Sequence, residues 1–227
     1  TVLLSNGKIL AGSLTDNRTY LYNPGNNTWT QTGSKLRNDS SQEETWLLLP
    51  NGNVLSYDVF ASPSTGQGTA QQYVPATGTW INAGTVPVPL SGSALGFELG
   101  PASLLPDGRL IQIGANNRTA IFTTSTNSWV AGPLLPTNKG SDDAPGAMLP
   151  DGHFLFAADM SQPEIFTGPT RLYDFDYTTN QITDVTPAAL SSFLNLPAFV
   201  FRMLVLPNGH LLLGQAESGV LWDYAPE

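Results

Sequence analysis

The sequence contains no cysteine, which excludes disulfide frameworks, thiolate metal sites and cysteine catalysis. Basic residues are also few: 9 lysines and arginines stand against 18 acidic residues, for a formal net charge of −9. Because nucleic acid is bound through clustered basic side chains, we expect no nucleic-acid partner. The same charge disfavours binding to anionic membrane surfaces.

Long apolar runs and catalytic signatures are missing as well. The longest apolar stretch, 194–206, is short and contains Arg202, so we expect no membrane insertion. No Gly-x-Ser-x-Gly elbow, phosphate loop or dinucleotide fingerprint is present. The chain starts without methionine inside a strand-like segment, so we expect it to be part of a longer precursor that is extracellular or exposed at the cell surface.

Turn signals are abundant, with 22 glycines and 18 prolines. Five segments share one plan, in which an Asn-Gly or Asp-Gly pair separates two apolar runs: 3–10, 48–55, 104–111, 148–155 and 205–212. This pattern predicts a β-hairpin closed by a type I′ turn.

A second motif alternates with the hairpins. An aromatic residue, a turn-prone stretch and a tryptophan seven positions later occur in "YNPGNNTW" (22–29), "YVPATGTW" (73–80) and "FTTSTNSW" (122–129). A fourth copy, 175–182, ends in isoleucine, and Tyr224 begins a fifth. Each copy predicts two further strands.

The two motifs together repeat about every 50 residues, and helical periodicity is nearly absent. Four strands per repeat at this spacing predict an all-β fold, a β-propeller of five four-stranded blades. We place the blades at about 1–38, 39–92, 93–140, 141–198 and 199–227. The last blade is incomplete, so we expect further sequence on both sides. Two alternatives stay open for the full protein: a propeller of five blades, or a larger one of which these five form an arc.

The repeat resembles the kelch repeat. Gly12, Gly114 and Gly214 stand where kelch repeats carry paired glycines, and "LLPDGR" and "YVPATGTW" are similar to bacterial secreted kelch proteins related to the central domain of galactose oxidase. The resemblance implies that the aromatic and tryptophan residues pack between blades. It does not extend to the copper site, because cysteine is absent and His153 and His210 lie at turns, where we expect no metal ligation.

In a propeller of this kind the two short turns of each blade share one face, and the long connections share the other. The connections at 58–69, 159–170 and 187–199 are long and irregular. Variable loops on a rigid scaffold are where binding sites usually lie. We therefore expect binding on the face of the long loops.

Aligning the blades on the hairpin turn brings acidic residues to equivalent places beside the axis. The residues expected there are Glu43, Glu44, Glu98, Asp142 and Asp143, with Arg202 as a nearby cation. Glu98 and Asp142 are the candidate metal ligands, for Ca²⁺. Three interpretations stay open: solvated loop acids, a cation or polar-ligand site, and an acid–base pair.

No catalytic residue is assigned from these patterns. The sequence favours a non-enzymatic recognition or scaffold module that binds a protein or a glycan through its long loops. The alternative is a carbohydrate-active enzyme that uses the acidic residues at the axis.

Overall fold

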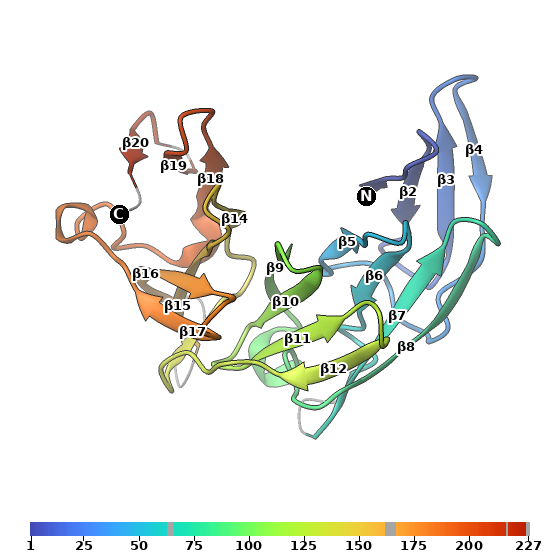
Figure 1. Cartoon of the computed structure of the whole chain (residues 1–227), viewed down its shortest axis with the longest axis horizontal. Helices are drawn as coiled ribbons and strands as arrows, with labels where there is room; N and C mark the ends of the chain where they lie inside the picture. The colour runs from blue at the N-terminus through green and yellow to red at the C-terminus, as the bar shows by residue number, and fades with distance from the viewer. Residues whose placement is uncertain (63–65, 162–166, 217, 226–227) are drawn as a thin grey trace.

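The computed structural model is a five-bladed β-propeller, in which five antiparallel sheets follow an arc (Figure 1). It describes residues 1–62, 66–161, 167–216 and 218–225. Within each blade the first strand lies toward the centre of the arc and the last strand lies at the rim. The first and fifth blades stand at the two ends of the arc.

The first three blades each have four strands in sequence order. Blade one contains β1 (Val2–Leu3), β2 (Ile9–Gly12), β3 (Thr19–Asn23) and β4 (Thr28–Gln31). Blade two contains β5 (Trp46–Leu48), β6 (Val54–Tyr57), β7 (Gly68–Val74) and β8 (Thr79–Val86). Blade three contains β9 (Leu99–Leu104), β10 (Arg109–Gly114), β11 (Thr119–Thr123) and β12 (Ser128–Ala131).

The last two blades depart from this plan. In blade four the first strand is split into β13 (Lys139–Gly140) and β14 (Gly146–Met148), which both pair with β15 (Phe154–Met160), followed by β16 (Thr167–Asp176) and β17 (Gln181–Asp184). Blade five has β18 (Phe201–Val205), β19 (Leu211–Gln215) and β20 (Leu221–Tyr224) among the described residues.

Helix is confined to three short 3₁₀ turns in the long connections: η1 (Ser93–Leu95), η2 (Ala188–Leu190) and η3 (Ala198–Val200). No helix among the described residues is long and apolar enough to cross a membrane.

The hairpin between the first two strands is confirmed in all five blades, but the predicted type I′ turn is wrong. In blade two Gly52 N donates to Leu49 O at 2.9 Å, and Leu49 N donates to Asn53 O at 2.8 Å. Gly52 has φ of 84°, whereas Asn51 is not among the residues with positive φ. This is a three-residue loop, a type I turn followed by a left-handed glycine. Pro50 fits the second position of this type I turn. It is not required for it, because blade one forms the same turn with Ser5 there, where Gly7 N donates to Leu4 O at 2.9 Å and Leu4 N donates to Lys8 O at 2.8 Å.

The aromatic motif packs between blades as expected in blades two and three, whereas Trp29 of blade one is 60% exposed. Tyr73 pairs with Trp80 across β7 and β8, with ring centroids 5.6 Å apart. Trp80 Nε1 donates to Thr19 Oγ1 of blade one at 3.1 Å, so this tryptophan packs between blades. Trp129 makes the equivalent contact with blade two, where its Nε1 donates to Ala83 O at 3.0 Å.

The core of the protein consists of four apolar clusters, one at each interface between successive blades. The interface of blades three and four, for example, brings Ile111 and Ile113 against Phe154, Phe156 and Phe175. Burial of this kind stabilises by roughly 25 cal/mol per Å² of apolar surface. The blades are thereby fixed against each other, and the segments that precede their first strands are held near the axis.

Candidate functional site

The candidate site lies on the loop face, which we define as the face formed by segments 32–45, 87–98, 132–145 and 185–200. Three of these segments lead into the innermost strands β5, β9 and β14. Neighbouring segments are bonded to each other: Asp143 N donates to Leu99 O at 3.2 Å, and Thr45 Oγ1 donates to Gly100 O at 3.2 Å. The residues that precede the first strands of blades two, three and four therefore lie side by side.

Three carboxylates converge there, one from each of these blades. Glu43, Glu98 and Asp143 each place an oxygen within 4.8 Å of the oxygens of the other two. Glu98 lies in the middle blade and is half-buried, whereas Glu43 and Asp143 are exposed. We call these three residues the axial triad.

The axial triad is electrostatically strained. Burial, followed by the charges of Asp143 and Glu43, raises the pKa of Glu98 to about 8. Burial and the charge of Asp143 also raise the pKa of Glu43. At an effective dielectric constant of about 20, two unit charges about 4.8 Å apart repel by roughly 3.5 kcal/mol, a value that solvent at the exposed members reduces.

No basic side chain of the described residues forms an ion pair with the triad. One oxygen of Glu98, Oε2, is buried and receives no hydrogen bond. Arg202, the expected cation, is exposed, and its Nη1 donates to the carbonyl oxygens of Phe199 and Phe201 at 2.7 and 2.6 Å. The structure therefore places Arg202 outside the triad.

A second carboxyl pair, Asp142 and Asp159, lies deeper and is called the inner pair here. Asp142 is 1% exposed and Asp159 is 0% exposed. Both oxygens of Asp142 lack a hydrogen-bond donor, as does Asp159 Oδ1, whereas Asp159 Oδ2 accepts from Ala198 N at 2.7 Å. Burial and the charge of Asp159 raise the pKa of Asp142 to about 9. At neutral pH the inner pair thus shares one proton.

The triad and the inner pair meet at one pocket. Glu98, Asp142, Asp143 and Phe199 line a cavity of about 200 Å³ on the loop face. Sequence alignment of the blades predicted Glu98 and Asp142 as one pair of metal ligands. The structure places Glu98 with Glu43 and Asp143, and it places Asp142 with Asp159.

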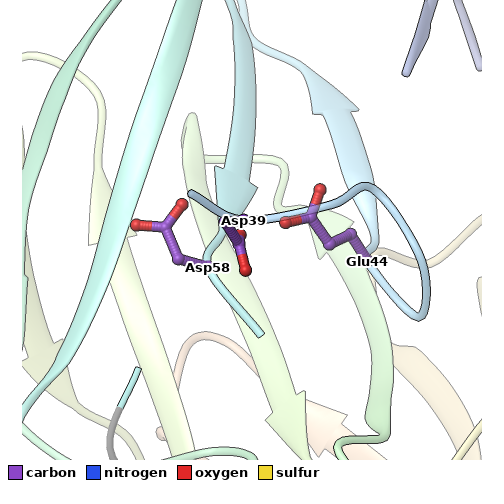
Figure 2. A group of neighbouring side chains, drawn as sticks. All are labelled: Asp39, Glu44 and Asp58. Atoms are coloured by element: carbon purple, nitrogen blue, oxygen red, sulfur yellow. The ribbon is translucent and has the colours of Figure 1, made fainter. Parts of the chain in front are cut away.

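Glu44 belongs to a separate group, which we call the lysine cluster: Lys35, Arg37, Asp39, Glu44 and Asp58. The acidic members gather around Asp39, which lies between Asp58 and Glu44 (Figure 2). The Lys35 and Asp39 side chains are fully buried, and Lys35 Nζ donates to Asp39 Oδ2 at 2.8 Å and to Glu44 Oε1.

The remaining acceptors of the lysine cluster are also satisfied. Arg37 Nη1 donates to Asp58 Oδ2 at 2.7 Å. Trp46 Nε1 donates to Glu44 Oε2 at 2.8 Å, and two backbone amides of segment 60–61 donate to Asp39 Oδ1. Burial raises the pKa of Glu44, and the Lys35 charge opposes that shift. The lysine ammonium thus occupies the place that a metal ion would take, and Glu44 faces it instead of joining the axial triad.

The two histidines lie at the hairpin turns, as expected. His153 Nδ1 lies 2.6 Å from Asp174 Oδ2, and His210 Nδ1 lies 2.8 Å from Asp223 Oδ1. In blade two the same position is Asn53, whose Nδ2 donates to Gln72 Oε1 at 3.0 Å. A polar pair between neighbouring strands recurs at this place in blades two, four and five, with asparagine or histidine, so we interpret it as part of the blade architecture.

Sequence reasoning missed Asp159 and the acidic partners Asp39 and Asp58. A weak signal was present, because Asp58 and Asp159 both stand at the end of the second strand of their blades, in "SYDVF" and "AADMS". Nothing in the sequence indicated their partners, which come from connections that have no periodic pattern.

Comparisons with known proteins support the fold. No protein-family model matches the chain, and no curated protein matches it. A solved structure from B. thetaiotaomicron, described as the extracellular domain of a candidate one-component system, superposes with a TM-score of 0.63 at 15% identity, over 93% of this chain and 25% of that chain. A second structure, described as the extracellular domain of a candidate hybrid two-component system, gives 0.60 at 15% identity, over 92% and 25%.

The chain therefore spans about a quarter of the length of these structures. At this identity the likeness concerns the fold alone. The resemblance to kelch repeats stays a prediction from the sequence.

Proposed function

We propose that the protein is a non-enzymatic, extracellular recognition module that binds a protein or a glycan on its loop face. One observation carries the proposal: three successive blades place carboxylates at one point of that face without an internal counter-charge among the described residues. Such a point attracts a ligand that supplies hydrogen-bond donors or positive charge.

The ligand chemistry follows from the acceptors on the triad. Carboxylates accept hydrogen bonds from sugar hydroxyls and from basic side chains. The opposite face offers less variety, because its turns repeat one hydrogen-bonding pattern in every blade. A glycan or a basic protein segment would therefore dock beside the axis, on the loop face.

An extracellular recognition role is consistent with the structural neighbours. Both are described as extracellular domains of candidate signalling systems. The present chain shares their fold over most of its length, so a comparable role outside the cell is our working proposal for it.

The alternative is a carbohydrate-active enzyme, and one observation favours it. Glu98 has a raised pKa of about 8 beside two further carboxyls. Retaining glycosidases use a protonated acid and a second carboxylate about 5 Å apart. Glu98 would then be the acid and Asp143 the second carboxyl group.

The test is a binding screen of the chain against glycans and basic peptides, with analysis of the recovered ligand. We expect saturable binding with no product, and a loss of affinity of about tenfold or more in Glu98→Gln. Asp151→Asn is the matched control on the opposite face. Asp151 accepts a hydrogen bond from His153 N at 3.0 Å, and Asn51 makes the same bond in blade two, so this variant removes one charge and keeps the turn.

Recovered cleavage products would overturn the proposal in favour of the enzyme, provided that Glu98→Gln abolishes their formation. Absence of binding to every member of the screen, together with absence of turnover, would count against both functions.

A further inference from the structure

The interfaces between successive blades use one recurring pair of faces. Directly paired residues of a sheet share a face, and blade two turns such a row toward blade one: Leu48, Val54, Tyr73 and Trp80. Blade one receives this row with a second one, which consists of Val2, Leu10 and Leu21. Leu10 and Tyr73 are fully buried there. We call the first kind of face the front of a blade and the second kind its back.

Blade one carries a front that no described residue covers. Its paired row consists of Leu3, Ile9, Tyr22 and Trp29, and this row lies on the side of the sheet opposite to blade two. Trp29 is 60% exposed, against 4% for Trp80 at the same position of blade two, and Leu3 is 64% exposed. The aromatic pair of blade one is thus formed without the neighbour on which the other tryptophans pack.

Blade five carries a back that is likewise uncovered among the described residues. Its front is used, because Val205, Leu211 and Tyr224 pack against blade four. On the other side of the sheet Leu204 pairs with Leu212, and Leu221 lies on the same face. Leu204 is 61% exposed and Leu221 is 62% exposed.

The two uncovered faces are complementary because they are the two halves of the recurring interface. Counted from the hairpin turn, Leu204 and Leu212 stand where blade one has Val2 and Leu10. Neighbouring exposed apolar side chains of this kind mark an interaction surface. At all four internal interfaces a front meets a back, so the partner that fits the front of blade one is the back of another blade.

We propose that copies of the 227-residue chain associate head to tail, with the front of blade one in one copy packed on the back of blade five in the next. Trp29 would take the place on blade five that Trp80 takes on blade one. In blade one that place holds Thr19, which pairs with Gly12, and in blade five it holds Leu221, which pairs with Gly214. The contact is heterologous, since it joins different surfaces of two copies.

This association goes beyond the proposed recognition function. Neither of the two faces contains a member of the axial triad, so the loop face stays accessible in the assembly. Association is measured without a glycan or a peptide, and failure of the one proposal therefore leaves the other standing.

The experiment is sedimentation velocity of the 227-residue chain at pH 7, from about 1 to about 100 µM. We expect the mean mass to rise with concentration. Trp29→Glu places a charge in the front and Leu221→Glu places one in the back, so each should weaken association by about tenfold or more. Val130→Glu is the matched control: Val130 is 55% exposed on β12 of blade three, away from both faces, and its variant should associate as the unmodified chain does.

Mixing the two variants tests the direction of the contact. Trp29→Glu keeps an intact back and Leu221→Glu keeps an intact front, so one head-to-tail contact can form between them. We expect the equimolar mixture to contain a dimer and no larger species. A contact between two like faces would instead survive in one of the two variants alone.

Three results would overturn the proposal. The first is an unmodified chain that stays monomeric at every concentration, which would favour a further blade as the occupant of both faces. The second is association that either variant retains in full, with circular dichroism showing that the variant is folded. The third is a mixture of the two folded variants that stays monomeric.

Discussion

Glu43 and Glu44 are neighbours in the sequence, yet they belong to two acidic groups with opposite character. Glu44 faces the lysine cluster, where the chain supplies its own cation and every acidic member has a hydrogen-bond donor. Glu43 belongs to the axial triad, which forms no ion pair among the described residues. A group of carboxylates is therefore not a binding site by virtue of their number alone. What matters is whether the fold already provides the counter-charge.

The two groups also differ in burial: the lysine cluster is buried, whereas two members of the axial triad are exposed. The Lys35, Asp39 and Glu44 side chains are fully buried, and charges can be held there only because they are paired. Glu43 and Asp143 are exposed and can exchange water for a ligand. The lysine cluster therefore ties the segment before β5 to blade two, whereas the axial triad remains available for binding.

The largest effect is expected from removing the internal cation. Lys35→Met leaves Asp39 and Glu44 buried without their counter-charge, and breaking a buried pair in this way costs about 3–5 kcal/mol. Urea denaturation at pH 7 measures the free energy of unfolding. Arg18→Met is the control: Arg18 pairs with Asp16 at the surface, where solvent screens the pair, so we expect little change in stability.

A loss of less than about 1 kcal/mol in Lys35→Met, equal to that of the control, would contradict the comparison. The two acidic groups would then differ in position and not in energetic role.

A smaller effect is expected from pH, and the axis contributes to it together with Glu44, whose pKa is also raised by burial. Asp142 and Glu98 have pKa values raised to about 9 and about 8, above their unfolded values of about 4. The folded state therefore binds more protons than the unfolded state between these limits, and stability falls as pH rises from about 5 to 9. Each proton contributes at most about 1.4 kcal/mol per pH unit, and the partial exposure of Glu98 reduces its share.

Asp142→Asn tests the origin of this slope. An asparagine cannot ionise, and its amide group can donate to Asp159 at every pH. We expect the free energy of unfolding, measured in urea at pH 5, 7 and 9, to fall less steeply in this variant. His153 also has a raised pKa and adds to the slope near neutral pH, but it contributes equally to both proteins. An unchanged slope would show that the inner pair does not share a proton.

The propeller could be predicted from the sequence because its determinants are local. Asn-Gly and Asp-Gly hairpins and aromatic pairs seven residues apart are set within a few residues, and their repetition fixes the number of blades. The turn type was predicted wrongly because the Asn-Gly pair was taken as a two-residue loop. The loop has three residues, and its glycine is the left-handed residue that follows a type I turn, with proline at the second position in blades two to five and Ser5 in blade one.

The convergence of Glu43, Glu98 and Asp143 could also be anticipated in part, since counting back from the turn prolines places Glu43 and Asp143 at the same position of their blades and Glu98 one residue earlier. The direction in which the Glu44 side chain points could not be predicted, because it depends on Lys35. That lysine is delivered by a connection between blades, whose path is set by tertiary contacts such as Lys35 N donating to Asn17 O at 2.8 Å. Contacts of this kind leave no periodic signal in the sequence.

The smallest expected effect comes from giving the axial triad what the lysine cluster already has. In Glu43→Lys an ammonium replaces one of the three carboxylates, opposite Glu98 and Asp143, so repulsion becomes attraction. Because position 43 is exposed, we expect a gain of only about 0.5–1 kcal/mol in the free energy of unfolding at pH 7. The pKa of Glu98 should fall, which carbon-detected NMR titration of the carboxyl measures. Glu43→Gln is the matched control, since it removes the charge without supplying a cation, and its stability should lie between those of the two proteins. If Glu43→Lys is less stable than Glu43→Gln, the absence of an internal cation is not what distinguishes the axial triad from the lysine cluster.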